Sequence, residues 1–195
     1  MSRWNNIKAK VSAAVIAAFF MGSPVGAEEF TGELRYACEA VLCLSSSTRP
    51  GECSPALNYF FNIKHKRIDK TIRKRLNFLN LCPASSETPD MENLVSALSR
   101  GSGRCDAQAL NKEIRWCRGA SREYHGYLHT SNIMPDYCRA LHGHSYTQLP
   151  PPVYVGEETH LGYWVEAVDY ERELAKYEER MRLLGNRYKG AICYR

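Results

Sequence analysis

The sequence predicts a mainly α-helical domain that is stapled by disulfide bonds and carries a small β-hairpin near its C-terminal third. Apolar residues recur at spacings of three and four over most of the chain, which is typical of amphipathic helices. Eight cysteines lie within 195 residues, and 44% of the residues are hydrophobic against 24% charged. This composition excludes a disordered chain and favours one compact unit that is cross-linked by its cysteines.

The first 27 residues have the pattern of a secretory signal peptide. Three basic residues precede an apolar run at 11–21, and Val25 and Ala27 occupy the −3 and −1 positions of a cleavage site. The apolar run is about eleven residues long, whereas roughly 20 are needed to cross a bilayer. We therefore expect cleavage after Ala27, and a single disulfide-rich, mostly helical domain at 28–195 with no membrane span.

All the cysteines follow the predicted leader. An even number of cysteines in an exported chain indicates a set of structural disulfides. No Cys-x-x-Cys pair indicates a zinc site, and an even count leaves no thiol for a nucleophile. The cysteines predicted to form structural disulfides are Cys38, Cys43, Cys53, Cys82, Cys105, Cys117, Cys138 and Cys193.

The first predicted helix spans 30–44, and its apolar face includes Cys38. Cys43 lies on a different face, so these two cysteines cannot bridge each other within one regular helix. Cys43 faces the turn that follows, and Cys53, on the far side of that turn, is a plausible partner.

Ser and Pro at 54–55 open a second helix, which runs to about Asn62. A third helix follows, because an apolar stripe recurs at helical spacing over 68–79 and Pro83 ends it. Cys82 continues this stripe, so Cys38 is its natural partner. Sequence alone does not fix connectivity, and both pairings remain hypotheses.

A stretch rich in Ser, Pro and Thr at 83–90 is the best internal linker, and a fourth helix begins at its end and stops at 101–103. A fifth helix is capped by Asp106, with an apolar face that extends to Cys117. Cys105 and Cys117 would then lie about 18 Å apart, at opposite ends of that helix. Each should bridge to another partner, for which Cys138 and Cys193 are the candidates.

The last part of the chain has weaker periodicity. Residues 118–152 are rich in turn formers and contain one short helix near 135–142. Two apolar runs at 153–155 and 161–165 flank a turn and predict a β-hairpin. A final surface helix with one apolar side spans 170–184.

No motif of a known enzyme class is present: the sequence lacks a nucleophile elbow, a P-loop, a dinucleotide fingerprint and H-E-x-x-H. Cleavage of the cell wall would need two carboxylates across a cleft. Glu33, Glu39 and Asp69 lie on predicted helices, where a solvated charge is the simpler explanation. We therefore predict no catalytic residue and expect that the protein is not an enzyme.

Histidines cluster in the irregular region, at His125, His129, His142 and His144. Imidazole groups at such spacings could bind a transition metal. Turn residues around them make a helix doubtful, however, and loop histidines need no ligand. We expect neither a metal site nor another cofactor.

The strongest charge feature is a basic segment at 64–75, in which Asp69 is the single acidic residue. It could meet an anionic surface such as lipid head groups, an acidic protein or DNA. Removal of the leader lowers the formal net charge from +5 to +2, and no aromatic residues alternate with the basic ones. A solvated helix face is therefore the simpler explanation, and we expect no nucleic-acid partner. The candidate partner-binding residues are Lys64, Lys66, Arg67, Lys70, Arg73, Lys74 and Arg75.

Several segments resemble a known family. Residues 37–46 (ACEAVLCLSS), 49–55 (RPGECSP) and 77–83 (NFLNLCP) are similar to the signature of the TrbM/KikA/MpfK conjugal-transfer proteins. Residues 151–156 (PPVYVG) and 162–167 (GYWVEA) resemble the C-terminal segment of that family.

The resemblance implies a periplasmic accessory or assembly protein of plasmid conjugation, encoded with the mating-pair-formation genes and working beside a type IV secretion apparatus. It implies no catalytic residues. The leading hypothesis is a module that binds components of the transfer apparatus. The alternatives are a hydrolase that acts on the cell wall and a binder of DNA or lipid surfaces that uses the basic segment.

Overall fold

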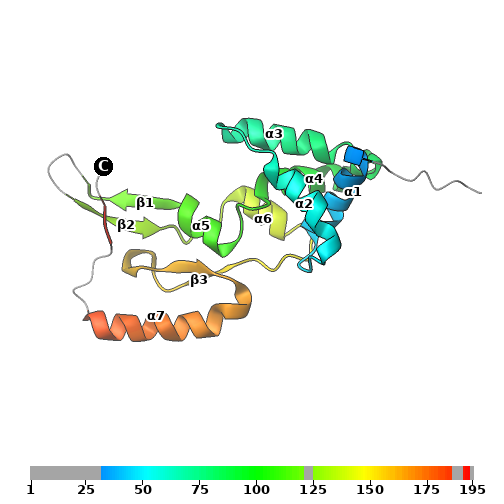
Figure 1. Cartoon of the computed structure of the whole chain (residues 1–195). Coiled ribbons are helices and arrows are strands. Elements are labelled where there is room, and N and C mark those ends of the chain that lie inside the picture. Colours follow the sequence, from blue (N-terminus) through cyan, green and yellow to red (C-terminus); the bar gives the residue numbers. More distant parts are fainter. Residues whose placement is uncertain (1–31, 121–124, 186–190, 194–195) are drawn as a thin grey trace, which may run out of the picture.

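The computed structural model describes residues 32–120, 125–185 and 191–193 (Figure 1). The predicted signal peptide at 1–27 lies outside these residues. The described chain is mainly α-helical, with two small antiparallel sheets and four disulfides, which confirms the predicted fold class.

Helices gather at one end of the molecule (Figure 1): α1 (Gly32–Ser45), α2 (Ser54–Asn62), α3 (Ile68–Leu79), α4 (Pro89–Gly101) and α6 (Asp136–His142). Helix α1 packs against α2, α3 and α4, and α4 also packs against α3 and α6. Proline at the first or second position starts both α2 and α4, and the Thr88 hydroxyl accepts a hydrogen bond from the Met91 amide at the start of α4.

The main core lies between these helices. Leu44, Phe60, Leu79 and Leu98, one from each of α1 to α4, have no solvent-exposed surface. Burial of each such side chain contributes about 1.5–3 kcal/mol to folding. The helices therefore share one core.

Two disulfides fix α1 to its neighbours, and both predicted pairings are confirmed. Cys38 of α1 is bonded to Cys82, three residues beyond the end of α3. Cys43 of α1 is bonded to Cys53, which immediately precedes α2. As a result, α1 is covalently tied to the start of α2 and to the end of α3.

The other two disulfides settle the pairings that the sequence left open. Cys105 is bonded to Cys138 of α6, and Cys117 to Cys193. The first bond joins α6 to the segment that follows α4, and both of its cysteines are buried among the helices. The bond between Cys117 and Cys193 joins the two outer strands of a sheet.

The prediction that a fifth helix reaches Cys117 is wrong. Helix α5 (Ala107–Glu113) begins as expected, with the Asp106 carboxylate accepting a hydrogen bond from the Ala109 amide, but it ends before Ile114. Cys117 lies instead in β1 (Arg115–Arg118). The apolar spacing that continues through this point is a local signal, and the pairing with a later strand overrides it.

That later strand is β2 (Gly126–Thr130), which the sequence did not predict. It runs antiparallel to β1, with Arg115 opposite Thr130, and it also pairs with β5 (Ala191–Cys193). The resulting strand order is β1-β2-β5. Only the pairing of β2 with β5 joins segments that are far apart in the chain. Strands β1 and β2 are neighbours in sequence, but the helical spacing before Cys117 and the turn residues after it concealed their pairing.

The predicted hairpin is confirmed as β3 (Val153–Val155) and β4 (Tyr163–Val165), with Val153 opposite Val165. Strand β4 begins at Tyr163, two residues later than the predicted start at Leu161. The connection before it contains a short 3₁₀ turn, and Leu161 adopts a positive φ of 63°. The predicted last helix is also confirmed, as α7 (Tyr170–Leu184).

Helix α7 is fastened to the hairpin through Tyr177. The Tyr177 hydroxyl accepts a hydrogen bond from the Glu157 amide (3.2 Å) and donates one to the His160 carbonyl (3.0 Å). Gly156, with a φ of +80°, lies so close to this ring that a Cβ atom would stand 2.2 Å from it. Only glycine therefore fits at this position without a rearrangement.

The hairpin is in turn joined to α5 through Asn111. Its side-chain carbonyl accepts a hydrogen bond from the Trp164 amide and its amide donates to the Trp164 carbonyl, both at 2.7 Å. The Trp164 ring is buried in the main core. Among the described residues, no helix is both long and apolar enough to cross a bilayer.

We predict that the bond between Cys38 and Cys82 contributes more to stability than the bond between Cys43 and Cys53. The first joins residues 44 positions apart and the second residues 10 positions apart, so the first restricts the unfolded chain more. The chain-entropy model gives losses of about 4 and about 3 kcal/mol for the two pairs of Cys→Ala substitutions. Urea unfolding of the two double variants measures the difference, and a larger loss for Cys43→Ala/Cys53→Ala would contradict it.

Candidate functional site

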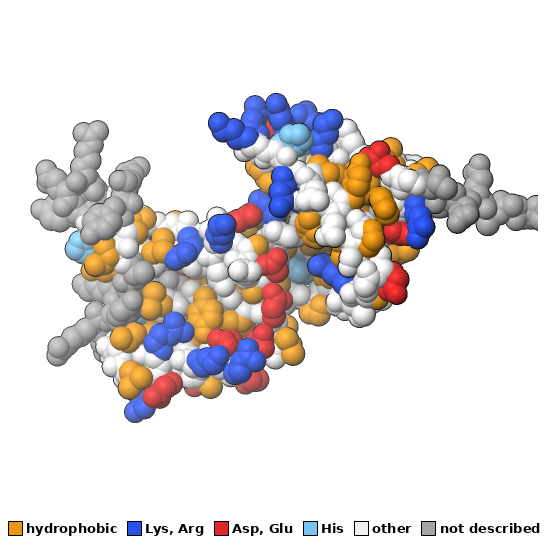
Figure 2. All heavy atoms as spheres, in the orientation of Figure 1, with side chains coloured by type: hydrophobic (Ala, Val, Ile, Leu, Met, Phe, Trp, Pro, Cys, Tyr) orange, Lys and Arg blue, Asp and Glu red, His pale blue; other side chains and the backbone are white. Residues whose placement is uncertain are grey.

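The basic segment predicted to face a partner covers the loop after α2 and the first part of α3. Figure 2 shows Lys and Arg side chains gathered over this part of the molecule, at the edge of the helical end. Six of the seven predicted residues are exposed, and we call them the basic rim. The basic rim consists of Lys64, Lys66, Arg67, Lys70, Arg73 and Lys74.

Most of the charge on the basic rim is unopposed. Arg67 forms a two-pronged ion pair with Asp69, with both N–O distances at 3.0 Å. Within the described ranges, no carboxylate forms an ion pair with the other five cations. An exposed ion pair contributes little to stability, so the rim is a source of positive potential and adds little to the stability of the fold.

Arg75, the seventh predicted residue, does not belong to the basic rim, and the prediction that it faces a partner is wrong. Its side chain is only 6% exposed, and its guanidinium lies over the rings of Phe60 (4.6 Å) and Phe61 (5.5 Å). It donates one hydrogen bond to the Ser102 carbonyl (3.3 Å), while its buried Nε has no hydrogen-bond partner among the described residues. Burial, and secondarily the charge of Arg104, lowers the pKa of Arg75.

Helix α3 is rotated relative to the predicted apolar stripe. Its buried face is formed by Thr71, Arg75, Phe78 and Leu79, whereas Ile68 at the start of the stripe is 51% exposed. The start of α3 lies at the outer edge of the helical end (Figure 1), and residues 64–70 are all exposed. The tip of the helix therefore offers apolar surface as well as charge.

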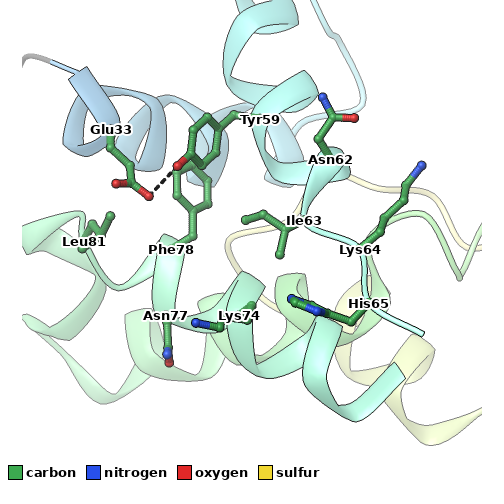
Figure 3. Close-up of a pocket in the computed structure, with 10 residues that line it drawn as sticks. All are labelled: Glu33, Tyr59, Asn62, Ile63, Lys64, His65, Lys74, Asn77, Phe78 and Leu81. Carbon is green, nitrogen blue, oxygen red and sulfur yellow. Dashed lines mark hydrogen bonds between the residues drawn. The ribbon is translucent and has the colours of Figure 1, made fainter. Parts of the chain in front are cut away.

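A groove lies beside the basic rim, between α1, α2 and α3. Its volume is about 640 Å³. Figure 3 shows the rings of Tyr59 and Phe78 on one side of the space and Ile63 across from them, with Lys74 and His65 along the lower edge. The groove is therefore apolar at its centre and cationic along the edge that it shares with the rim.

The aromatic wall of the groove is held in a defined position. The Tyr59 ring stacks on Phe78 with centroids 4.7 Å apart, and Tyr36 packs against Tyr59 at 6.0 Å. The Tyr59 hydroxyl donates a hydrogen bond of 2.6 Å to the Glu33 carboxylate, and this bond is the main cause that raises the pKa of Tyr59. Tyr59 is thus a neutral, fixed ring that is still 38% exposed.

The three carboxylates considered for catalysis each have a separate partner. Glu33 lines the groove and accepts the Tyr59 hydrogen bond, Glu39 pairs with Arg35 at 2.7 Å, and Asp69 pairs with Arg67. Of the three, only Glu33 lines the groove.

The four candidate histidines are likewise held separately. The His129 ring packs on Trp116 and its Nδ1 lies 2.9 Å from the Glu158 carbonyl. His142 lies between two backbone carbonyls, each at 3.1 Å, His144 lies near the Asp90 carbonyl, and His125 meets the edge of the Tyr127 ring. The described part of the chain contains no group of three or more His, Cys, Asp or Glu placed to hold a metal ion.

Sequence reasoning missed the aromatic wall and Leu81. Tyr59 and Phe78 belong to different helices, and only the packing of α2 on α3 brings their rings together. One signal was present, because Phe78 and Leu81 lie in the segment 77–83 that carries the family resemblance. That segment also contains Cys82, and the need for this cysteine in a disulfide already explained the resemblance, so Phe78 and Leu81 drew no separate attention.

Comparison with protein families gives one match. The TrbM family model matches residues 29–178, a range that contains the groove and the whole basic rim. A search of curated proteins and a search of solved structures found no match.

We predict that Arg75→Met changes the free energy of unfolding by less than about 1 kcal/mol. Methionine keeps the packing on Phe60 and removes a buried charge that has one hydrogen bond and no carboxylate partner among the described residues. Arg75→Ala should cost about 2–4 kcal/mol, because it leaves a cavity beside the ring. Urea unfolding of both variants tests this, and an equal loss for Met and Ala would mean that the charge itself is required.

Proposed function

The chain belongs to the TrbM family, which links it to conjugal plasmid transfer, and from this membership we propose that it is an accessory protein of mating-pair formation. It works in the periplasm beside the type IV secretion apparatus. It acts by binding a protein component of that apparatus and catalyses no reaction.

Two features support a periplasmic location. The leader at 1–27 has the pattern of an export signal. The described chain contains four disulfides and no free cysteine, and such bonds persist in oxidising compartments.

The observation that carries a binding role is the basic rim beside an open apolar groove on a cross-linked framework. Both walls of the groove belong to helices that disulfides tie to α1. A surface that is already rigid loses little conformational entropy when a partner binds. Exposed Tyr59 and Leu81 provide the apolar contact area that such interfaces use at their centre.

We predict that deletion of the gene lowers the frequency of plasmid transfer at least tenfold in a host that lacks any second copy. The wild-type gene should restore transfer, whereas a version that begins at Glu28 behind an initiator Met should not, because it stays in a reducing compartment. Mating assays measure both effects. Unchanged transfer after deletion would refute a role in conjugation, and full rescue by the leaderless version would refute the location.

The same purified protein should give no clearing band in cell-wall zymography. A band that disappears with a single Glu or Asp substitution would instead favour the cell-wall hydrolase.

A further inference from the structure

We propose that the groove between α1, α2 and α3 binds an extended peptide segment of a partner protein, in which an apolar anchor residue is flanked by Asp or Glu. This inference rests on the proposed docking function and gives it a ligand chemistry. The anchor occupies the aromatic end of the groove, and the acidic residues lie along the basic rim.

The position of the anchor follows from the exposed apolar side chains. Tyr59 and Leu81 are 38% and 42% exposed, although both border a pocket whose centre is formed by Ile63 and Phe78 (Figure 3). A side chain that entered this space would remove the rings and Leu81 from water. Tyrosine is enriched among the residues that dominate binding energy, because it offers a large area with few rotatable bonds.

The anchor site is also prepared before a partner arrives. Tyr59 is fixed by its stacking on Phe78 and by the hydrogen bond from its hydroxyl to Glu33. The end of α3 that carries Phe78 is tied to α1 through the bond between Cys38 and Cys82. The wall therefore needs little rearrangement to accept a side chain.

The flanking charge follows from the distribution of ionised groups. Lys64 and Lys74 line the groove directly, and Lys66, Lys70 and Arg73 extend the positive surface away from it. Within the described part of the chain none of these five forms an ion pair, and the acidic side chain nearest in the lining, Glu33, is engaged by Tyr59 at the opposite end. Acidic residues in a ligand would thus be attracted to the rim end and repelled from the Glu33 end, so they lie on the rim side of the anchor.

The shape of the site favours a peptide over the two other anionic ligands. A volume of about 640 Å³ accommodates side chains that protrude from an extended chain, whereas a bilayer surface is too broad to enter it. Nucleic acid would need free aromatic faces for base stacking, but the Tyr59 ring already stacks on Phe78.

Selection from a random library of 12-residue peptides on phage, with the full mature protein as bait, tests the inference. We expect the enriched peptides to place Trp, Phe or Leu beside two or more acidic residues, and to bind at least tenfold more weakly in 0.5 M salt than in 0.05 M salt. Tyr59→Ala and Lys64→Glu/Lys74→Glu should each weaken binding of the selected peptides at least tenfold. Lys112→Glu/Arg118→Glu, which makes the same charge change at exposed positions of α5 and β1, is the matched control and should change binding less than twofold.

Three results would overturn the inference. The first is no enrichment, or enrichment without acidic residues. The second is retention of the selected peptides by both groove variants while circular dichroism shows them folded. The third is tighter binding of a 30-nucleotide DNA or of phosphatidylglycerol vesicles than of any peptide, with loss of that binding in Lys64→Glu/Lys74→Glu.

Mating assays separate a failure of this inference from a failure of the proposed function. If the gene is required for transfer but Lys64→Glu/Lys74→Glu and Tyr59→Ala restore it fully, the docking site is wrong and the role in conjugation stands. If deletion has no effect on transfer, the proposed function itself fails, whatever the peptides bind.

Discussion

The disulfide between Cys38 and Cys82 is the constraint on which the candidate site depends. It ties the middle of α1 to the end of α3, and the groove lies between these two helices and α2. Leu44, Phe60 and Leu79 of the same three helices fill the core without solvent exposure, so the packing and the covalent bond hold the same arrangement. The apolar wall can therefore remain exposed to water without collapsing inward. The start of α3 can carry a high density of positive charge at the edge of the fold, because the other end of the helix is fixed.

The fold of the first half follows closely from the sequence, and the reasons are local. Helix caps, prolines and apolar spacing predict α1 to α4, and the face on which each cysteine lies predicts the pairings of Cys38 and Cys43. The sequence also predicts the hairpin at β3 and β4 and the last helix, α7. It does not predict the sheet that contains β1 and β2, because no local pattern in these strands distinguishes strand from helix.

The candidate site shows the same division. Charge density predicts the basic rim, but it cannot tell that Arg75 turns inward while Lys74 beside it remains outside. That difference is set by the rotation of α3 about its axis, which the core residues Phe78 and Leu79 determine. The aromatic wall depends on contacts between α2 and α3 and therefore requires the tertiary structure. In this chain the segment 77–83 joins both features, since it supplies a ring of the wall and the cysteine that anchors it.

The most direct measurement of the cross-linked framework is differential alkylation of the protein in cells of its native host, followed by mass spectrometry of its peptides. Denaturation in alkylating reagent without reductant should leave all eight cysteines unmodified, and a peptide containing Cys38 should be found joined to one containing Cys82. Alkylation of Cys38 and Cys82 under these conditions would contradict this result. The helices that form the groove would then lack their covalent tie. The proposed periplasmic location would also lose its main physical support.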